Sequence, residues 1–566
     1  MNELTEFLAA RNQIIANRTD YASAISQFKW PTLSNFNWAT DYFDSIALNN
    51  SNAALRIVEE TGEIAQLSYA ELSERSSQVA NFLVGLGAQA GDRLLLMLGN
   101  EVPLWETMLA AIKLGAVVIP ATPLLSATDL ADRMVRGKVK FVITNATGMA
   151  RLAEIPKPAL KGICLISVTP ALSLPEGWSY YGDAQNSAKE FKSSQMLTVD
   201  QPLLEYFTSG TTAKPKLVRH SRQSYPVGHL STLYWLGLKQ GDIHWTISSP
   251  GWAKHAWSCF FAPFNAQACV FIYNYHRFNA PAILNVLVQE GVQTLCAPPT
   301  VWRMLIQEDL KKWPVKLREA ISAGEPLNPE VIEQVRSAWG IEIRDGYGQT
   351  ETTAMIGNPP GATLKAGSMG RPLPGYKIEL LDTDGLPSDE GEICVSLKDR
   401  PLSLMDGYAD DSEKTAESMR DGYYHSGDVG SRDAEGYITY VGRADDVFKA
   451  AGYRISPFEL ESALIEHPAV AEAAVVPSPD PVRGFVPKAY IILAPGHQPD
   501  AVTAIAIFSF LRDRVSSYKM IRRIEFSDLP KTISGKIRRV DLRGQEKIRP
   551  AIGSRNSAEF LEELSR

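Results

Sequence analysis

The chain has 566 residues, of which 45% are hydrophobic and 21% are charged, as is typical of soluble globular proteins. This length exceeds one ordinary hydrophobic core and predicts about two to four packed units. The formal net charge of −7 argues against a protein that binds nucleic acid through phosphate contacts, because such a surface needs an excess of Lys and Arg.

The cysteines lie far apart and include no C-x-x-C pair; they are Cys164, Cys259, Cys269, Cys296 and Cys394. Most fall in apolar, strand-like runs, which predicts buried thiols in a reducing compartment. The N-terminus is acidic where a signal peptide would be basic. No apolar stretch reaches the roughly 18 uncharged residues that a membrane span needs. We therefore predict a cytoplasmic protein without a membrane span.

The first part of the chain predicts a leader followed by alternating helices and strands. Residues 1–60 hold aromatic residues among polar ones and are expected to pack on the main body. Ser68 and Glu71 have the spacing of a capping box that opens a helix at 69–83. Further elements are expected as strands at 93–98, 116–120, 141–144 and 163–168, and as a helix at 104–114. This alternation indicates a parallel sheet with βαβ crossovers.

The alternation resumes after residue 242 and then gives way to other patterns. Strands are expected at 243–249, 269–273, 294–297 and 341–344, and helices at 281–290 and 329–339. Beyond Gly367, short apolar runs between Gly and Pro residues predict antiparallel strands with tight turns. From Gly442 a compact unit is expected, with helices at 457–466 and 501–515 and strands at 471–477 and 489–493.

One polar stretch, Tyr206-Phe-Thr-Ser-Gly-Thr-Thr-Ala-Lys-Pro-Lys216, follows an apolar run at 203–207. Its backbone N–H groups, hydroxyls and ammonium groups suit a polyphosphate. It is not a Walker A loop, which needs G-x-x-x-x-G-K-[ST], and Pro215 argues against a helix running through Lys214. The alternative interpretation of this stretch alone is a polar surface loop.

Two further turns are expected after strands, where ligands bind in doubly wound sheets. Residues 345–351 (Asp-Gly-Tyr-Gly-Gln-Thr-Glu) offer a hydroxyl and a carboxylate, which suit a phosphate and its Mg²⁺ ion. Residues 322–327 (Ser-Ala-Gly-Glu-Pro-Leu) form a glycine turn that fits along a flat base. The alternative is that both are ordinary β–α turns.

Three positions near the C-terminal unit complete the pattern. Asp428 can accept both hydrogen bonds of a ribose diol, and Arg443 supplies a fixed fork of donors for phosphate or ribose oxygens. In Leu529-Pro-Lys-Thr-Ile-Ser-Gly-Lys536, the glycine allows a tight turn that presents Lys536. Taken alone, this basic segment is better explained as a solvated face, because basic runs usually are.

Together these segments resemble the adenylate-forming superfamily, which comprises acyl- and aryl-CoA synthetases, luciferases and peptide-synthetase adenylation domains. The resemblance covers about residues 60–545, with the motifs in the family's order. It is greatest to the acetyl- and medium-chain acyl-CoA synthetase branch. The segments that carry this are Gly346-Tyr-Gly-Gln-Thr-Glu, Gly452-Tyr-Arg-Ile and Pro479-Asp-Pro-Val-Arg-Gly484.

The resemblance implies an α/β fold. A large N-terminal domain of doubly wound sheets plus a small distorted β-barrel is expected at 1–443, with its β-rich subdomain at 370–443. A small, mobile α+β lid domain is expected at 444–545. The remaining residues, 546–566, are charged and are expected to form a loosely held tail.

The resemblance also implies which residues hold ATP. The implied ligands of the β- and γ-phosphates are Thr208, Ser209, Gly210, Thr211, Thr212 and Lys216. The implied contacts around adenine and its neighbourhood are Gly324, Glu325, Pro326, Asp345, Gly346, Tyr347 and Gln349. Asp428 and Arg443 are implied to hold the ribose. Ala213 departs from the family's usual glycine, at a cost of about 1 kcal/mol or more if its φ is positive.

Other implied roles concern the chemistry, the hinge and the two remaining substrates. Thr350 is implied to contact the α-phosphate, Glu351 to bind Mg²⁺, and Lys536 to bridge the carboxylate and the α-phosphate. The implied hinge is Asp445. The implied contacts of coenzyme A are Gly452, Tyr453, Arg454 and Arg483, and those of the acyl group are Trp252, Ala253, Lys254 and Gly348.

The acyl pocket carries two expectations. Gly348 stands where acetate-specific relatives carry tryptophan, so the resemblance implies an acid longer than acetate. Lys254 is expected either to point inward and pair with a carboxylate or to extend its ammonium group to solvent.

The implied activity is that of an ATP-dependent acyl-CoA synthetase. A carboxylic acid and ATP give acyl-AMP and pyrophosphate, and CoA then gives acyl-CoA and AMP. Lys536 and Mg²⁺ offset the charge that builds at phosphorus, and no general base is needed because the acid is already ionised. The acid is expected to be short- or medium-chain, with branched and aromatic acids included. The expected partners are this acid, ATP and CoA, without nucleic acid, for a monomer or homodimer.

Three alternatives remain open from the sequence. An acyl-AMP ligase would load a carrier-protein phosphopantetheine in place of free CoA. A non-catalytic nucleotide-binding regulator would keep the fold, although it would not need both Lys536 and Glu351. A P-loop kinase or ATPase is the weakest alternative, because the Walker pattern is absent.

Overall fold

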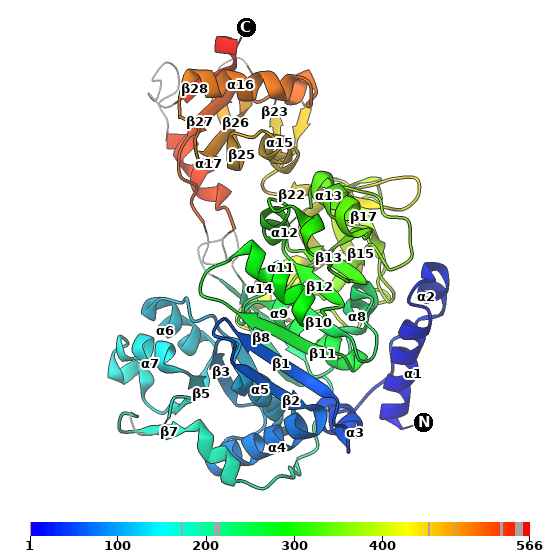
Figure 1. Ribbon diagram of the computed structural model, residues 1–566, viewed down its shortest axis with the longest axis vertical. Helices are drawn as coiled ribbons and strands as arrows, with labels where there is room; N and C mark the ends of the chain where they lie inside the picture. Colours follow the sequence, from blue (N-terminus) through cyan, green and yellow to red (C-terminus); the bar gives the residue numbers. More distant parts are fainter. Residues whose placement is uncertain are drawn as a thin grey trace.

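The structure is a computed structural model that describes residues 2–170, 174–193, 195–208, 215–325, 327–450, 453–480, 483–531, 536–548 and 559–565. Two large sheets and a smaller antiparallel sheet form the main body. The C-terminal unit lies at one end of the molecule, beyond that body (Figure 1). This arrangement confirms the predicted α/β class with a large N-terminal part and a smaller C-terminal one.

The first large sheet has the strand order β19-β9-β8-β4-β3-β5-β6-β7. Its strands are β3 (Arg93–Met97), β4 (Val117–Pro120), β5 (Val139–Thr144), β6 (Cys164–Ser167), β7 (Trp178–Tyr180), β8 (Pro202–Thr208), β9 (Lys216–Ser221) and β19 (Gly407–Tyr408). The strands from β8 to β7 pair in parallel, and β9 and β19 add antiparallel pairs at one edge. The predicted βαβ alternation is therefore confirmed here.

The helices of this half are α4 (Tyr69–Gly85), α5 (Val102–Leu114), α6 (Ala127–Arg136) and α7 (Ala146–Ala153). The predicted capping box of α4 is present, because the Ser68 hydroxyl accepts from the Glu71 N–H while the Glu71 carboxylate accepts from the Ser68 N–H. Such a cap satisfies N–H groups that a helix start leaves unpaired. It fixes where α4 begins.

The second large sheet has the order β16-β15-β14-β13-β12-β10-β11-β1-β2. Its strands are β1 (Ala53–Glu59), β2 (Ile64–Ser68), β10 (Ile243–Thr246), β11 (Cys269–Asn274), β12 (Thr294–Ala297), β13 (Glu319–Ala323), β14 (Ile343–Gly348), β15 (Ala354–Gly357) and β16 (Arg371–Pro372). Its helices are α8 (Leu230–Leu236), α9 (Ala253–Ala256), α10 (Ala262–Ala266), α11 (Ala280–Gln289), α12 (Pro299–Leu305) and α13 (Pro329–Trp339). The central strands β1, β11, β10, β12, β13 and β14 are parallel.

Strand β14 corrects one prediction. The strand was expected to end at Arg344, with the motif 345–351 as the turn after it, but β14 continues to Gly348. Its second half pairs in antiparallel fashion with β15, and these backbone hydrogen bonds keep the motif extended. Only the last part of the motif, from Gln349, therefore forms the turn.

The N-terminal segment packs on the body, but the expected leader of residues 1–60 is too long, because β1 (Ala53–Glu59) pairs on both sides within the second sheet. It forms α1 (Glu3–Ala16), α2 (Tyr21–Gln27), a π-helical turn at Trp38–Phe43 and α3 (Asp44–Ala47). Trp38 and Tyr42 are fully buried. Trp38 Nε1 donates to Asn265 Oδ1 at 2.8 Å, which ties the leader to the second half of the body.

The β-rich subdomain and the C-terminal unit complete the chain. The subdomain contains β17 (Ile378–Leu381), β18 (Glu390–Ser396), β20 (Met419–Arg420), β21 (Tyr423–Arg432), β22 (Ile438–Arg443) and α14 (Ser412–Ser418). The C-terminal unit contains β23 (Phe448–Ala450), β24 (Tyr453–Ile455), α15 (Pro457–Ile465), β25 (Val470–Asp480), β26 (Gly484–Leu493), α16 (Ala501–Arg512), β27 (Arg523–Phe526), α17 (Arg539–Ile548) and β28 (Glu559–Leu561). Short 3₁₀ and π turns lie at Lys157–Leu160, Tyr181–Asn186, Trp257–Phe261, Leu310–Lys312, Ser517–Lys519 and Glu562–Ser565.

The prediction of a loosely held tail from residue 546 is wrong for its described part. Strand β28 pairs with β27 in the C-terminal sheet, and Glu546 on α17 is 1% exposed. The reason is Lys488 on β26, whose fully buried ammonium group lies 2.9 Å from Glu546, 2.7 Å from Glu525 and 3.2 Å from Glu559. A high charge content in the sequence therefore marks a buried ionic cluster here.

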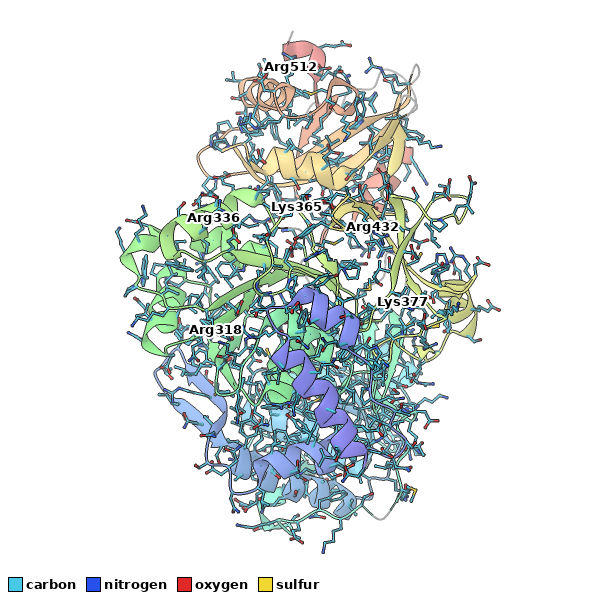
Figure 2. The ribbon with its side chains drawn as sticks, turned by 90° about the vertical axis from the view of Figure 1, so that its right-hand side faces the viewer. Arg318, Arg336, Lys365, Lys377, Arg432 and Arg512 are labelled. Carbon is cyan, nitrogen blue, oxygen red and sulfur yellow. The ribbon has the colours of Figure 1, made fainter. Side chains whose placement is uncertain are left out.

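The surface cations labelled in Figure 2 are spread over both the body and the C-terminal unit. Each of them forms an ion pair with a carboxylate: Arg318, Arg336, Lys365, Lys377, Arg432 and Arg512. All five cysteines are free thiols, and four of them are buried. Among the described residues, no helix is both long enough and apolar enough to cross a membrane.

The Lys488 cluster gives a test of stability. Replacing Lys488 by alanine should lower the free energy of unfolding of the C-terminal unit by about 3–5 kcal/mol, because three carboxylates stay buried without their cation. Hydrogen exchange of β26 and β28 amides, followed by mass spectrometry, measures this loss. The matched control is Lys531→Ala, which removes a partly exposed pair with Glu472 and should cost at most about 1 kcal/mol. Equal exchange in both variants would show that the cluster does not anchor β28.

Candidate active site

The predicted phosphate side lies at the edge of the first sheet. Thr208 ends β8 and Lys216 begins β9, and the two residues pair across the hairpin. Four of the residues predicted there lie outside the described residues, namely Ser209, Gly210, Thr211 and Thr212, as does Ala213. What the structure does describe is the base of the hairpin, with the Lys216 side chain half-buried.

A tyrosine that the sequence analysis did not single out joins the phosphate side to the acidic residue. Lys216 Nζ lies 3.5 Å from Tyr408 Oη, and this hydroxyl donates to Glu351 Oε1 at 3.0 Å. Burial lowers the pKa of Lys216, while the Glu351 carboxylate acts in the opposite direction. Tyr408 sits on the two-residue strand β19, too short to leave a periodic signal in the sequence. Lys216 and Glu351, which are 135 positions apart in the printed sequence, are thus brought to one hydroxyl.

Asp428 is the centre of the predicted ribose site. Its Oδ2 accepts from Tyr347 Oη and from Gln349 Nε2, both at 2.6 Å. Its Oδ1 accepts from Tyr440 Oη at 3.2 Å and from Arg443 Nη1 at 3.4 Å. The Asp428 side chain is buried, so these donors compensate a carboxylate that has lost most of its water. The structure therefore brings together four predicted site residues, and it adds Tyr440, which the sequence analysis missed.

Arg443 links this carboxylate to the predicted hinge. It lies opposite Asp428 in the β21–β22 pair, and its Nε lies 3.4 Å from Asp445 Oδ1. Although burial alone would lower the pKa of Arg443, the neighbouring Asp428 and Asp445 carboxylates raise it above its ordinary value. The guanidinium therefore stays charged between the ribose site and Asp445. The hinge role of Asp445 stays a prediction.

The predicted adenine side lies at the carboxyl ends of β13 and β14. Gly324 follows β13 with φ = +108°, a conformation that favours glycine. Glu325 lies 3.8 Å from Arg303, and Pro326 falls outside the described residues. On the neighbouring strand, Gly346 N–H donates to Asp345 Oδ1 at 2.9 Å. The two motifs therefore lie side by side, residues 322–325 at the end of β13 and residues 345–348 within the adjacent strand β14.

Lys254 points inward. Its Nζ donates to the Ala323 carbonyl at 2.9 Å, which places the ammonium group beside the adenine turn and away from bulk solvent. Burial raises the pKa of Asp345 to about 7, opposed by the Gly346 and Leu327 N–H groups and by the Lys254 charge. The Lys254 side chain therefore turns inward, but its hydrogen-bond acceptor is a backbone carbonyl and not the expected carboxylate, and its role in the acyl pocket stays a prediction.

The space at Gly348 is already occupied. A Cβ atom at this position would lie 2.1 Å from the Thr353 carbonyl oxygen and 2.9 Å from Trp257 Cη2. Trp257 Nε1 donates to Tyr225 Oη at 3.0 Å, and Tyr225 Oη in turn donates to the Thr350 carbonyl at 3.2 Å. Gly348 is thus required by close packing, and the ring that closes this side comes from Trp257. Trp252 precedes α9, and Ala253 is its first, buried residue.

The predicted CoA residues and Lys536 belong to the C-terminal unit. Gly452 lies outside the described residues, and Tyr453 and Arg454 lie on β24, which pairs with β23. Arg483 is exposed in the turn before β26, and its N–H donates to Asp480 Oδ1 at 2.9 Å. Lys536 is exposed and lies shortly before α17. The roles of these residues stay predictions.

The buried carboxyl of Asp345 gives a test with pH. With its pKa raised from 3.8 to about 7, the folded chain holds this proton while the unfolded chain releases it. The stability that protonation contributes is present at about pH 4 and is lost as the pH rises toward about 7. In the Asp345→Asn variant this loss is absent. Its melting temperature relative to the parent should therefore rise between these pH values and then level off. A difference that is independent of pH in differential scanning fluorimetry would contradict the raised pKa.

Comparison with known proteins gives two family matches and many close relatives. Residues 37–409 match the model of the AMP-binding enzyme family, and residues 459–536 match that of the AMP-binding enzyme C-terminal domain. The chain is 41% identical to 4-hydroxybutyrate–CoA ligase 1 of Metallosphaera sedula over 94% of each chain. It is 39% identical to the mitochondrial acyl-coenzyme A synthetase ACSM4 of Homo sapiens, over 92% of this chain and 93% of the relative.

Solved structures agree with these matches. An anthranilate CoA ligase in complex with anthranoyl-AMP superposes with a TM-score of 0.80 at 25% identity, covering 91% of this chain and 98% of that one. A benzoate CoA ligase from Burkholderia xenovorans gives 0.77 at 28% identity, covering 90% and 100%. Because one family model spans more than half of the chain and the relatives align over nearly all of it, the chain belongs to the family of AMP-binding enzymes.

Proposed function

We propose that the chain is an AMP-forming acyl-CoA synthetase that acts on a short- or medium-chain carboxylic acid. The observation that carries this proposal is the pair of clusters around Tyr408 and Asp428. The first offers a cation and a carboxylate where a triphosphate and its metal ion need them. The second offers a ribose-binding carboxylate from a different sheet. Relatives at 38–41% identity are acyl-CoA synthetases and CoA ligases, which favours CoA as the acceptor.

The carboxylate of Glu351 fits a Mg²⁺ ion bound together with ATP. Mg²⁺ prefers oxygen ligands and is held in such sites by one or two carboxylates plus substrate phosphates. Glu351 would supply the carboxylate: its Oε1 accepts from Tyr408, and no hydrogen bond to its Oε2 is found among the described residues. When bound, the ion would neutralise charge on the phosphates. Tyr408 would keep the Glu351 side chain oriented toward that position.

Side chains of both the main body and the C-terminal unit would take part in the two half-reactions. The acid is already ionised at neutral pH, so its carboxylate attacks the α-phosphate without a general base. Lys216 and Lys536 would offset the negative charge that builds on the phosphates as pyrophosphate leaves. Asp428 and Arg443 would hold the ribose, which fixes the α-phosphate in line with the attacking oxygen. The thiol of CoA then attacks the acyl carbonyl, and AMP leaves.

The acid itself is limited by the packing around Gly348. Since the Trp257 ring lies against this glycine, it would form one wall of the acyl pocket. An acid of medium length or a flat aromatic acid fits beside such a ring better than a long chain would. The inward ammonium group of Lys254 favours an acid with a polar or short tail. The cytoplasmic location stays a prediction, since some relatives are named as mitochondrial. The monomeric or dimeric state also stays a prediction.

Pyrophosphate release tests this proposal. The assay uses ATP and Mg²⁺ with acids from acetate to decanoate, together with branched and aromatic members, each with and without CoA. A synthetase turns over only with CoA and peaks on one group of acids. Adenylate formation that ignores CoA would point to a carrier protein as the acceptor. Absence of pyrophosphate with every acid would contradict an acid ligase of this range.

Separate half-reactions test Lys536. The Lys536→Ala variant should lose adenylation by at least about 100-fold, because the variant lacks the charge that stabilises the transition state. Transfer from preformed acyl-AMP to CoA should fall by less than about threefold. Arg538→Ala, a change two residues away in the same basic segment, serves as the control. Equal loss of both half-reactions would contradict the assigned role of Lys536.

Trp257 tests the acyl pocket. Replacing it by leucine removes the wall beside Gly348 and should shift the preference in kcat/KM toward longer acids by about tenfold, as expected for one or two methylene groups in an apolar pocket. Tyr225→Phe is the matched control, because it removes the hydrogen bond of the Trp257 ring without making space. A chain-length profile that changes equally in both variants would show that packing of the ring does not set the preference.

A further inference from the structure

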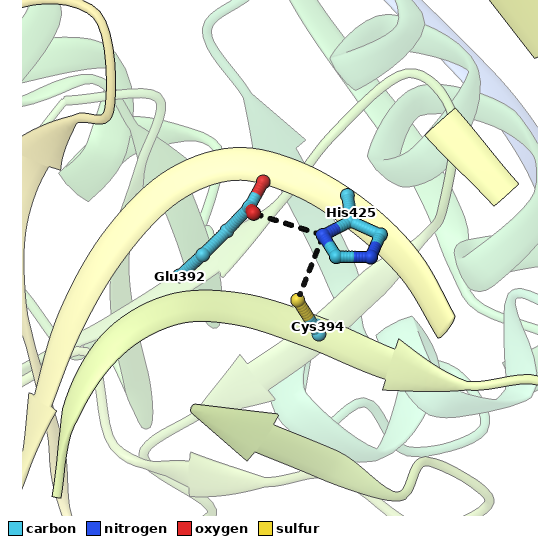
Figure 3. Close-up of side chains that lie close together, drawn as sticks. All are labelled: Glu392, Cys394 and His425. Atoms are coloured by element: carbon cyan, nitrogen blue, oxygen red, sulfur yellow. Dashed lines mark hydrogen bonds and ion pairs between the residues drawn. The ribbon is translucent and has the colours of Figure 1, made fainter. Parts of the chain in front are cut away.

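A three-residue cluster lies behind the segment that carries Asp428. Figure 3 shows Glu392 and Cys394 on β18 facing His425 on β21. Glu392 Oε2 lies 2.9 Å from His425 Nδ1, and Cys394 Sγ lies 3.5 Å from the same nitrogen. His425 is followed after two residues by Asp428, so this cluster sits directly beside the proposed ribose site.

The pairing register of β18 and β21 shifts at this point. Cys394 pairs with His425 and Glu392 pairs with Val429, so residues 426–428 of β21 lie opposite Ile393 alone. Such a bulge bends its strand and re-aims its side chains. At its centre Gly427 has φ = +72°, a left-handed conformation that favours glycine.

Glu392 holds this bulge on two sides. While Oε2 faces His425, Oε1 accepts from the Gly427 N–H at 2.8 Å. Hydrogen bonds to a carboxylate are shorter and stronger than those between neutral groups. Arg420 Nη2, at 4.0 Å, adds a positive charge on the same side. One side chain of β18 therefore fixes both the backbone of the bulge and the ring before it.

A bound metal ion is not needed to account for the position of Glu392 in this cluster. Among the described residues it is the one group of three His, Cys, Asp or Glu side chains close enough to hold an ion. However, both Glu392 oxygens already have hydrogen-bond partners. In the metal-free site, burial raises the pKa of the Cys394 thiol, and the Glu392 charge raises it further. The hydrogen bonds therefore explain the position of Glu392 without a cation, while His425 Nε2 is buried and has no hydrogen-bond partner among the described residues.

We propose that Glu392 is a positioning residue, which fixes the Gly427 bulge and thereby aims the Asp428 carboxylate at the ribose diol of ATP. This inference rests on the proposed function, because it takes Asp428 to bind the ribose. Misplacement of a substrate-binding group by about 1 Å is enough to lower activity about 100-fold. Glu392 acts through Asp428 and does not itself touch the nucleotide.

The test compares ATP with 2′-deoxy-ATP in the adenylation half-reaction. If Asp428 accepts from the ribose diol, the parent prefers ATP, and loss of Glu392 should weaken that preference. In Glu392→Ala the ratio of kcat/KM values for ATP and 2′-deoxy-ATP should fall at least about fivefold, mostly through the KM for ATP. Glu392→Gln keeps the volume and one acceptor for the Gly427 N–H, so its ratio should lie between those of alanine and parent. A general loss of structure would lower kcat/KM for ATP and for 2′-deoxy-ATP by the same factor and would leave their ratio unchanged.

Further variants distinguish a failure of the positioning role from a failure of the ribose role. Asp428→Ala should abolish the preference for ATP. If it does not, the ribose role in the proposed function fails. If Asp428→Ala abolishes the preference but both Glu392 variants keep the parent ratio, the positioning role is overturned. Glu379→Ala, which removes a partly exposed carboxylate from the neighbouring strand β17, is the matched control and should keep the parent ratio. Zinc bound to the purified protein in a 1:1 ratio, and lost from Cys394→Ala, would also overturn the hydrogen-bonded arrangement.

Discussion

The buried carboxylate of Asp428 is the constraint on which the site depends. Its four hydrogen-bond donors come from β14 and the turn after it in the large sheet, and from β22 in the β-rich subdomain. A carboxylate removed from water is costly unless donors surround it, so the two sheets must keep their relative positions for the donors to meet. The same requirement that satisfies Asp428 also places Tyr347 and Gln349 beside the proposed ribose site.

The C-terminal unit is tied to this site through charged pairs. Arg443 contacts both Asp428 and Asp445. The next residue, Asp446, is buried and forms ion pairs with Arg543 and Arg539 of α17. Helix α17 begins just after Lys536, so the proposed hinge and the segment that carries the proposed catalytic lysine share one ionic network. Breaking a buried pair of this kind by removing one partner is strongly destabilising.

The acyl side shows how packing, and not one residue type, sets a pocket. Glycine at 348 suggested open space, yet the Thr353 carbonyl and the Trp257 ring take up that space. A larger residue there would collide with backbone, which cannot move as a side chain can. Trp257 is in turn held by Tyr225. The wall of the proposed acyl pocket would therefore be built by residues from three separate segments.

The sequence by itself determined the class of fold, the order of most elements and the identity of the motifs. Local signals were sufficient there, because capping residues, apolar runs and glycine turns act over a few positions, as at Ser68 and α13. What only the tertiary structure decided depends on contacts between distant segments. These include the continuation of β14 through Gly348, the Tyr408 link between Lys216 and Glu351, and the burial of Glu546 against Lys488. Each of these features depends either on a partner more than 50 positions away or on pairing with another strand. Such contacts leave no local pattern in the sequence.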